Sequence, residues 1–288
     1  MTPAPADLRA RAEAVSAALP GLMLSATRLA AMVAPGAHGL RRAGVGDDFW
    51  QYRPAHAGDS ARNIDWRRSA RSDAEYVRDR QAQTAQSAMI WVSAGQGMGF
   101  ASPGAVTKRD RAQVIALALG LLLLRGGERV GLLDQAARSG RAQADSLAQS
   151  LLAAPVASGD DDAPPRHALR PHQRVVLIGD FLAEPDWLPS FLAQAAGMGA
   201  TGVLLQILDA AEADFPFVGA VEFHSASGAA RHDSRDAAGL RAAYLERLAQ
   251  RQAWLADHAG RAAWAFHSHR TDHAAGDALA WLWRAMGG

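Results

Sequence analysis

The sequence predicts an α/β protein with a mostly parallel sheet and helices on both faces. Short apolar runs that fit buried strands alternate along the chain with longer apolar or amphipathic stretches that fit helices. Of the 288 residues, 49% are hydrophobic and 20% are charged, which is the composition of a globular protein with a large core. No internal repeat is visible, so a repeat architecture is not expected.

Charge and cysteine content exclude several functional classes. There are 30 basic and 29 acidic residues, so no overall field draws the protein to nucleic acid or to an anionic membrane. The chain contains no cysteine, which excludes disulfides, thiolate metal sites, iron–sulfur clusters and cysteine nucleophiles. Lys108 is the sole lysine, and we attribute the preference for arginine to a coding bias.

The N-terminal segment, Pro5 to about Val33, reads as two short amphipathic helices separated by a break at Pro20–Gly21. The longest unbroken apolar run, residues 114–124, is far shorter than the ~20 residues needed to span a bilayer. The first twenty residues have no apolar signal-peptide core and carry charges at helical spacing, namely Asp7, Arg9, Arg11 and Glu13. We therefore expect a cytoplasmic protein without membrane insertion.

The rest of the chain divides into a loop-rich segment and the alternating α/β pattern. We expect residues 1–86 to form N-terminal helices and an ordered, arginine-rich loop segment, and residues 87–288 to form the α/β domain. Residues 158–170 are expected to be a polar linker, and a β-hairpin is expected over residues 218–232. Strands are expected at 87–93, 129–133, 174–178, 202–208 and 262–267, and helices at 108–124, 143–152, 187–198, 240–259 and 277–286.

Two positions compete for the ligand crevice, which in open α/β sheets lies beyond the carboxyl ends of the strands. One is the turn after the first strand, from Ser93 through Gly95 and Gly97 to Gly99, and the other is Asp180, directly after the third strand. The glycine spacing is not the G-x-G-x-x-G dinucleotide fingerprint, so no nucleotide cofactor is expected.

The segment from Gly36 to Arg80 carries the most distinctive motifs of the chain. They are Gly44-x-Gly46-Asp47-Asp48-Phe49, Tyr52-Arg53-Pro54, Gly58-Asp59-x-x-Arg62-x-Ile64-Asp65-Trp66-Arg67, Ser69-Ala70-Arg71 and Tyr76-Val77-Arg78, followed downstream by Leu208-Asp209-x-x-Glu212-x-x-Phe215-Pro216-Phe217-x-Gly219. Over nearly the whole chain this pattern resembles the domain of unknown function 58 family. The resemblance implies a von Willebrand factor A-like (Rossmann-like) domain and partnership with a MoxR-type AAA+ ATPase.

The sequence departs from the family at the metal site. The resemblance implies an Asp-x-Ser-x-Ser motif at the first turn, but the matching positions here are Ser93, Gly95 and Gly97. Only Asp180 remains as a carboxylate, and one carboxylate with a hydroxyl is a weak ligand set for Mg²⁺ or Ca²⁺. We expect a degenerate motif that binds no metal. The alternative is a metal-dependent binding module with Asp180 as its principal ligand.

The arginines of the signature segment have two readings that the sequence leaves open. Nine arginines and seven acidic residues lie between Arg41 and Arg80, an excess too small for a nucleic-acid-binding arm. They can pair with one another to hold an irregular loop. Alternatively, they can form a protein-docking surface, since arginine and tryptophan are favoured interface anchors; its residues would be Arg53, Asp59, Arg62, Asp65, Trp66, Arg67 and Arg71.

Catalytic chemistry finds little support. No G-x-S-x-G nucleophile elbow is present, and no carboxylate pair is singled out by spacing. His267, His269 and His273, with Asp272, could share a metal at a strand end, but we expect a solvated strand end. A hydrolase that uses Ser93 or these histidines is the remaining enzyme alternative. We expect a non-catalytic, cytoplasmic adaptor, and the resemblance implies that it works with the ATPase in assembly or maturation of a client protein.

Overall fold

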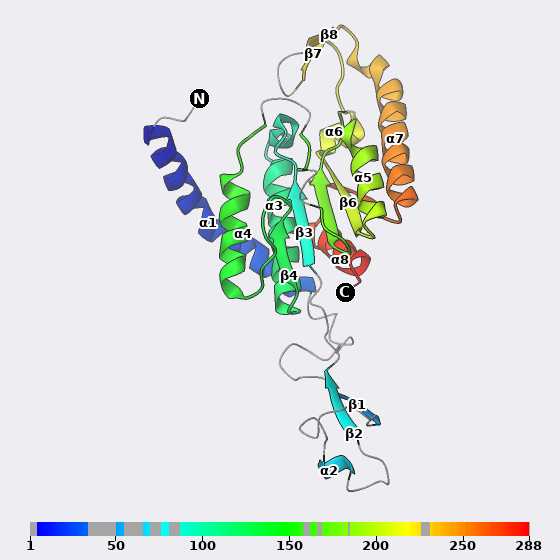
Figure 1. Cartoon of the computed structure of the whole chain (residues 1–288). Coiled ribbons are helices and arrows are strands. Elements are labelled where there is room, and N and C mark those ends of the chain that lie inside the picture. Colours follow the sequence, from blue (N-terminus) through cyan, green and yellow to red (C-terminus); the bar gives the residue numbers. More distant parts are fainter. Residues whose placement is uncertain are drawn as a thin grey trace. The chain divides into compact units, whose positions relative to one another are not determined.

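Five parallel strands form the central sheet, in the order β4-β3-β5-β6-β9 (Figure 1). Neighbouring strands pair in parallel register throughout, as between Val176 of β5 and Val203 of β6. β5 is buried along almost its whole length, as expected for a strand covered on both faces. The strands are β3 (Ser87–Val92), β4 (Arg129–Leu132), β5 (Arg174–Gly179), β6 (Thr201–Leu208) and β9 (Ala265–Arg270).

The computed structural model describes residues 5–33, 50–54, 66–69, 76–80, 87–157, 162–165, 169–183, 185–225 and 231–287. These residues belong to two compact units. One unit comprises residues 1–39 together with 86–288, and the other comprises residues 40–85. The N-terminal helix therefore belongs to the α/β unit, whereas the expected division at residue 86 grouped it with the signature segment.

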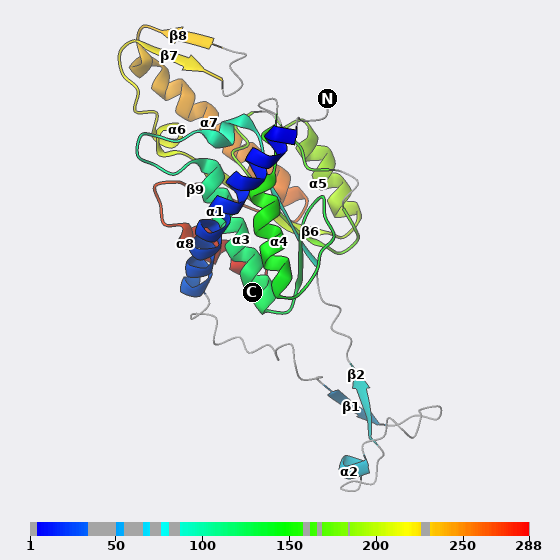
Figure 2. The same cartoon turned by 90° about the vertical axis from the view of Figure 1, so that its left-hand side faces the viewer.

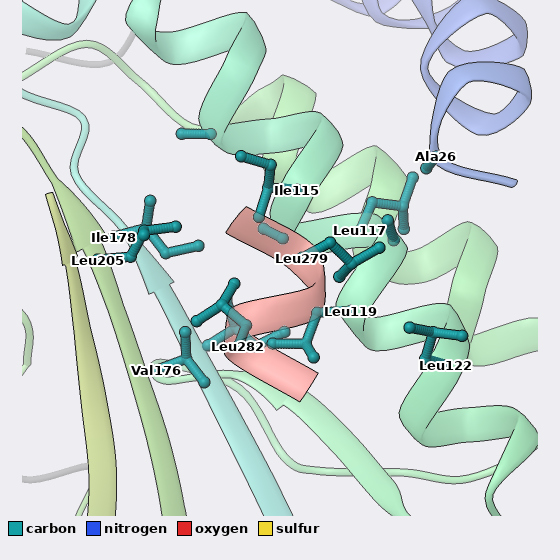
Figure 3. Packing of buried hydrophobic residues seen from close by; sticks show 14 of the residues in the cluster. Ala26, Ile115, Leu117, Leu119, Leu122, Val176, Ile178, Leu205, Leu279 and Leu282 are labelled. Carbon is teal, nitrogen blue, oxygen red and sulfur yellow. The ribbon is translucent and has the colours of Figure 1, made fainter. Parts of the chain in front are cut away.

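Helices cover both faces of the sheet, and this confirms the predicted α/β class. Alternate residues of β5 point to opposite faces: Val176 and Ile178 pack in one core cluster, and Val175 and Leu177 in the other. Figure 3 shows the first cluster, where Val176 and Ile178 face Ile115 and Leu282. The first cluster contains α1 (Pro5–Val33), α3 (Lys108–Arg125), α4 (Arg141–Ala153) and α8 (Ala275–Ala285), and the second contains α5 (Trp187–Gly197) and α7 (Ala237–Arg261).

The N-terminal segment is one helix rather than the two that were predicted. α1 runs unbroken from Pro5 to Val33 with Pro20 inside it. Its C-terminal half crosses α3 and α4 and reaches α8 (Figure 2), and it buries a stripe consisting of Leu22, Ala26, Leu29 and Ala30. Tertiary packing of that stripe outweighs the local breaking tendency of proline, which costs a helix one hydrogen bond.

The length and composition of α1 bear on the cellular location of the protein. Within it, the 21 residues Glu13–Val33 are long and apolar enough to cross a membrane by length and composition. A signal sequence and a buried core helix meet the same criterion. No long unbroken apolar run marks this segment in the sequence, because polar residues such as Ser16, Ser25 and Arg28 interrupt it. The expected cytoplasmic location is therefore not confirmed.

Smaller elements complete the α/β unit. A short 3₁₀ helix, η3 (Gln96–Gly99), follows β3, and α6 (Ala210–Asp214) follows β6. β7 (Val221–His224) and β8 (Arg231–Ser234) pair antiparallel, with Val221 opposite Ser234, so the predicted hairpin is confirmed. Residues 226–230, between the two strands, lie outside the described residues.

The second unit contains a two-stranded antiparallel sheet and a single helical turn. β1 (Trp50–Pro54) pairs with β2 (Tyr76–Arg80), and α2 (Trp66–Ser69) lies between them in the sequence. The backbone N–H of Tyr76 donates a hydrogen bond to Ser69 Oγ at 2.9 Å, which ties β2 to α2.

Candidate functional site

The strand order reverses between β3 and β5, and this places a ligand crevice at their carboxyl ends. From β3 the chain goes to β4 on one side of the sheet and then to β5, β6 and β9 on the other. Ser93 follows β3, and its backbone N–H donates to the carbonyl of Ile178 at 2.8 Å. Asp180 directly follows β5, which ends at Gly179. The structure thus brings the two positions predicted from the sequence to the same edge.

A buried lysine occupies the centre of this crevice. Lys108 Nζ donates to Asp180 Oδ2 at 2.8 Å and to Glu212 Oε1 at 2.6 Å. The Lys108 side chain is fully buried, whereas the side chains of Asp180 and Glu212 are 17% and 15% exposed. We call these three residues the ion triple. It joins the start of α3, the end of β5 and α6 through opposite charges.

Glu212 is held by a capping box at the start of α6. Its Oε2 accepts a hydrogen bond from the backbone N–H of Asp209 at 2.9 Å, while Asp209 Oδ1 accepts from the N–H of Ala211 at 2.9 Å. Burial raises the pKa of Glu212, although the Lys108 ammonium opposes this effect. One carboxylate oxygen of Glu212 thus orders the helix while the other meets the lysine.

Asp209 is the fully buried partner in this capping box, and its role is structural. Its carboxylate accepts hydrogen bonds from the backbone and hydroxyl of Ser102 and from the hydroxyl of Thr271. Burial opposes ionisation of Asp209, but the hydrogen bonds from Ser102, Ala211 and Thr271 outweigh burial and lower its pKa. Asp209 therefore joins α6 to the loop before α3 and to the end of β9.

Asp180 is fixed through its backbone as well as its side chain. Gln206 is fully buried in β6, and its Nε2 donates to the carbonyl of Asp180 at 2.8 Å. Gln252 of α7 donates to Gln206 Oε1 at 3.1 Å and so orients that amide. The next residue, Phe181, has a left-handed backbone conformation with φ +49°. At this residue the chain turns away from the direction of β5 and leaves the sheet. The position of the Asp180 carboxylate is therefore set by two neighbouring elements.

The turn after β3 is closed by hydrogen bonds of its own. Gly95 N–H donates to Ser93 Oγ at 3.2 Å, which is a local turn contact. The carbonyls of Ala94 and Gly95 both accept from Arg109 Nη2 at 3.1 Å, and the N–H of Ala94 donates to the Asp162 carboxylate. Among the described residues, the Ser93 hydroxyl accepts a hydrogen bond from the backbone rather than from a histidine, so this geometry does not activate it as a nucleophile.

The residues of the crevice do not fit the divalent cation that the family resemblance implies. A hard cation needs several anionic or carbonyl oxygens at 2.0–2.6 Å. Here the ammonium of Lys108 already lies 2.8 Å from Asp180 Oδ2, and the guanidinium of Arg109 holds the turn carbonyls of Ala94 and Gly95. A divalent ion beside Asp180 would be repelled by the ammonium.

An aromatic pocket of about 350 Å³ opens next to the ion triple. One wall consists of Lys108, Asp180 and Glu212, and Tyr244 OH donates to the backbone carbonyl of Glu212 at 2.8 Å. Burial raises the pKa of Tyr244 to about 12, so its hydroxyl stays protonated as a donor. The large apolar side chains of the lining are Phe100, Leu182, Phe215, Phe217, Phe223 and Tyr244.

The aromatic rings of this pocket pack against one another. Phe215 has its ring centroid 4.6 Å from that of Tyr244 and 5.1 Å from that of Phe217. Phe223 of the β7–β8 hairpin lies 5.4 Å from Phe217. The hairpin therefore supplies part of the pocket. The sequence indicated the hairpin but did not indicate the pocket.

The alternative of a histidine metal cluster is not supported, and the expected solvated strand end is wrong for His269, which is buried by the packing around β9. His267 stacks on Trp281 of α8 with ring centroids 4.9 Å apart, and His269 is buried with 3% of its surface exposed. Within the described part of the chain, no group of three histidine or carboxylate side chains is arranged to hold a metal ion. Asp272 instead forms an ion pair with Arg270 at 2.9 Å. These residues thus stabilise the end of β9.

The docking residues predicted in the signature segment are described only in part. Arg53 lies in β1 and Arg67 in α2. Trp66, at the start of α2, is 59% exposed, which is high for so large an apolar side chain. Asp59, Arg62, Asp65 and Arg71 lie outside the described residues.

Lys108 and Glu212 are the functional candidates that sequence reasoning missed. Their pairing joins positions 104 residues apart, and that of Lys108 with Asp180 joins positions 72 apart, so no local pattern shows either contact. One feature of the sequence did point to Lys108. In a chain with 30 basic residues, a single lysine marks a place where a compact ammonium fits and a planar guanidinium does not.

A match to a protein-family model shows the family to which this chain belongs. The model of the family described as "Protein of unknown function DUF58" matches residues 51–254, which include the ion triple. The chain belongs to the DUF58 family. This DUF58 chain is 29% identical over 211 residues to uncharacterized proteins of Mycobacterium tuberculosis (Rv1480) and Mycobacterium bovis (Mb1516). The match covers 68% of this chain and 66% of each relative, so it spans slightly less than two thirds of their length.

Two solved structures resemble this DUF58 protein at low sequence identity. One is an aerotolerance-related membrane protein from Bacteroides fragilis NCTC 9343, with a TM-score of 0.41 and 13% identity. The other is the conserved hypothetical protein BatB from Bacteroides thetaiotaomicron, with a TM-score of 0.40 and 10% identity. Each similarity covers 70% of this chain and 98% of the other.

Proposed function

We propose that this DUF58 protein is a non-catalytic adaptor that binds other proteins through the crevice at the carboxyl edge of its sheet. The ion triple is the observation that carries the proposal. The ammonium of Lys108 and the carboxylates of Asp180 and Glu212 are paired with one another. Charged groups that satisfy one another are suited to holding a binding surface in shape, whereas acid–base catalysis needs a group free to exchange a proton with substrate.

The aromatic pocket supports a binding role. Its volume of about 350 Å³ is within the range of sites that take one bulky side chain or a small ligand. Interface energy is concentrated where an apolar anchor enters such a pocket. Phe217 and Phe223 are only partly buried and are therefore accessible to a partner.

The identity of the partner rests on the resemblance of the signature motifs. We propose a MoxR-type AAA+ ATPase as one partner and a client protein undergoing assembly or maturation as the other. Such an ATPase needs ATP, so the proposal places the crevice in the cytoplasm. The packing of Leu22, Ala26 and Leu29 of α1 into the core supports a helix that belongs to the folded domain.

Affinity capture from the native lysate tests this function. Tagged protein is incubated with and without ATP and with and without EDTA, and retained proteins are identified by mass spectrometry. We expect to capture an AAA+ ATPase whose binding survives EDTA. We also expect the two purified proteins to bind each other directly. Phe217→Ala should weaken that direct binding, whereas Val218→Ala should not, because Val218 is 73% exposed and does not line the pocket. Absence of an AAA+ ATPase under every condition contradicts the proposed partner.

A further inference from the structure

We propose that the ammonium of Lys108 is the built-in cation of the crevice and takes the place of a divalent metal ion. The inference concerns how the crevice is held together, so it goes beyond the adaptor role and does not depend on any partner. Lys108 Nζ is the point on which two carboxylates from different parts of the sheet edge converge.

The two carboxylates require a cation between them. Asp180 Oδ2 and Glu212 Oε1 lie 2.8 Å and 2.6 Å from the same nitrogen atom. Two carboxylates this close cannot both be ionised without a positive charge to offset their repulsion. Lys108 supplies that charge from within the chain, at hydrogen-bond distances and with its side chain fully buried.

The placement of Lys108 on its helix supports the same conclusion. It is the first residue of α3, directly after the N-cap Thr107. A positive charge is unfavourable at a helix N-terminus because the backbone N–H groups there carry partial positive charge. The helix gains nothing from a cation at this position. The carboxylates of Asp180 and Glu212 offset this unfavourable interaction. Lys108 therefore stabilises the crevice and not α3.

Removing the ammonium should therefore expose a cation site. Truncation of Lys108 to alanine leaves the Asp180 and Glu212 oxygens facing the space that Nζ occupied. Glu212 Oε1, at 2.6 Å, lies at the upper end of the 2.0–2.6 Å range of Mg²⁺ or Ca²⁺ ligands, and Asp180 Oδ2, at 2.8 Å, lies slightly beyond it, so small side-chain movements suffice. Water can complete the coordination, as it commonly does for Mg²⁺.

Thermal unfolding of the purified full chain tests the proposal. The melting temperature, Tm, is measured in EDTA and in Mg²⁺, Ca²⁺ or Mn²⁺ for the wild type, for Lys108→Ala and for a control that combines Lys108→Ala with Asp180→Asn and Glu212→Gln. We expect no cation-dependent shift for the wild type. Lys108→Ala should melt lower in EDTA and gain about 5–10 °C at a cation concentration 100 times its Kd, and the control should gain nothing.

Two results would overturn the inference. One is a wild-type Tm that rises with a divalent cation and loses that rise in Asp180→Asn, because the crevice would then hold a metal beside Lys108. The other is a Lys108→Ala chain that ignores all three cations. If Lys108→Ala does not fold in EDTA, adding the cation should restore a cooperative transition, and failure to restore it counts against the proposal. Neither result depends on the capture experiment, so the two proposals can fail separately.

Discussion

His269 combines deep burial with an unpaired ring nitrogen. It is 3% exposed, and within the described residues its Nε2 has no hydrogen-bond partner. Burial first, and then the positive charges of Arg111, His267 and His273, lower its pKa to about 4. In the unfolded chain a histidine binds its proton near pH 6.5. The unfolded state therefore binds more protons below that pH, and His269 makes folding less favourable as the pH falls from about 6.5 to about 4.

Replacing His269 by phenylalanine should remove this pH dependence. We expect the wild type to lose about 2 kcal/mol more unfolding free energy than His269→Phe between pH 7 and pH 4.5. Urea unfolding at the two pH values measures the difference. His232→Phe is the matched control, since it makes the same substitution at an exposed position on β8. Equal pH dependence in the wild type and His269→Phe would contradict the expected role.

Gly202 of β6 is required by a close approach of the backbone. A Cβ atom there would lie 2.3 Å from the carbonyl oxygen of Val175 and 2.8 Å from the ring of Trp264. Gly202→Ala should destabilise the protein by about 2–4 kcal/mol. Gly260→Ala in α7 is the control, because nothing lies within 4 Å of its added Cβ and a helical glycine gains about 0.5–1 kcal/mol as alanine. Denaturant unfolding of both variants checks the contrast, and equal stability would refute it.

At the residue scale, sequence reasoning found the positions at strand ends and missed those that meet through tertiary contacts. Ser93 and Asp180 were predicted because buried apolar runs end just before them. Asp209 and Glu212 were visible only as part of a family motif. Lys108 looked like a compositional exception because a helix start says nothing about what faces it across the sheet edge.

At the scale of elements, α1 has one buried and one exposed side. Leu29 is 6% exposed and packs in the core, whereas Met32, three residues later on the same helix, is 71% exposed. Leu29→Ala should cost about 2–4 kcal/mol of unfolding free energy. Met32→Ala should change it by about 0.5 kcal/mol or less. Denaturant unfolding tests the pair, and a small effect of Leu29→Ala would mean that α1 is not docked as the structure places it.

The buried strands were predicted closely, with the exception of the last one. Buried parallel strands are short continuous apolar runs, and β3, β5 and β6 match such runs almost residue for residue. The last strand was expected at 262–267 but spans Ala265–Arg270. The chain first turns through Ala263, at φ +56°, and anchors Trp264 Nε1 on the carbonyl of Ala200. This tertiary anchor has no local sequence signal, so the apolar residues before it were assigned to the strand.

At the scale of the whole molecule, the chain consists of two compact units of unequal size. Residues 1–39 and 86–288 form one unit, into which residues 40–85 are inserted. Replacing residues 40–85 with a Gly/Ser linker should leave a cooperative thermal transition within a few degrees of that of the wild type. Deleting residues 1–39 is the contrasting variant, since it uncovers the core positions that Leu22, Ala26, Leu29 and Ala30 cover. Calorimetry checks both, and loss of the transition in the linker variant would contradict the division.

Because the chain has a single lysine, the reactivity of Lys108 would also report how often the crevice opens. Lys108 is the only lysine in the chain and is fully buried, so the folded state offers acylating reagents no lysine amine. A lysine-specific protease has one cleavage site, between residues 108 and 109. Cleavage into exactly two fragments, or acylation of that single side chain, would follow the rate at which the crevice opens. Such labelling could be read in a crude extract without any engineered probe.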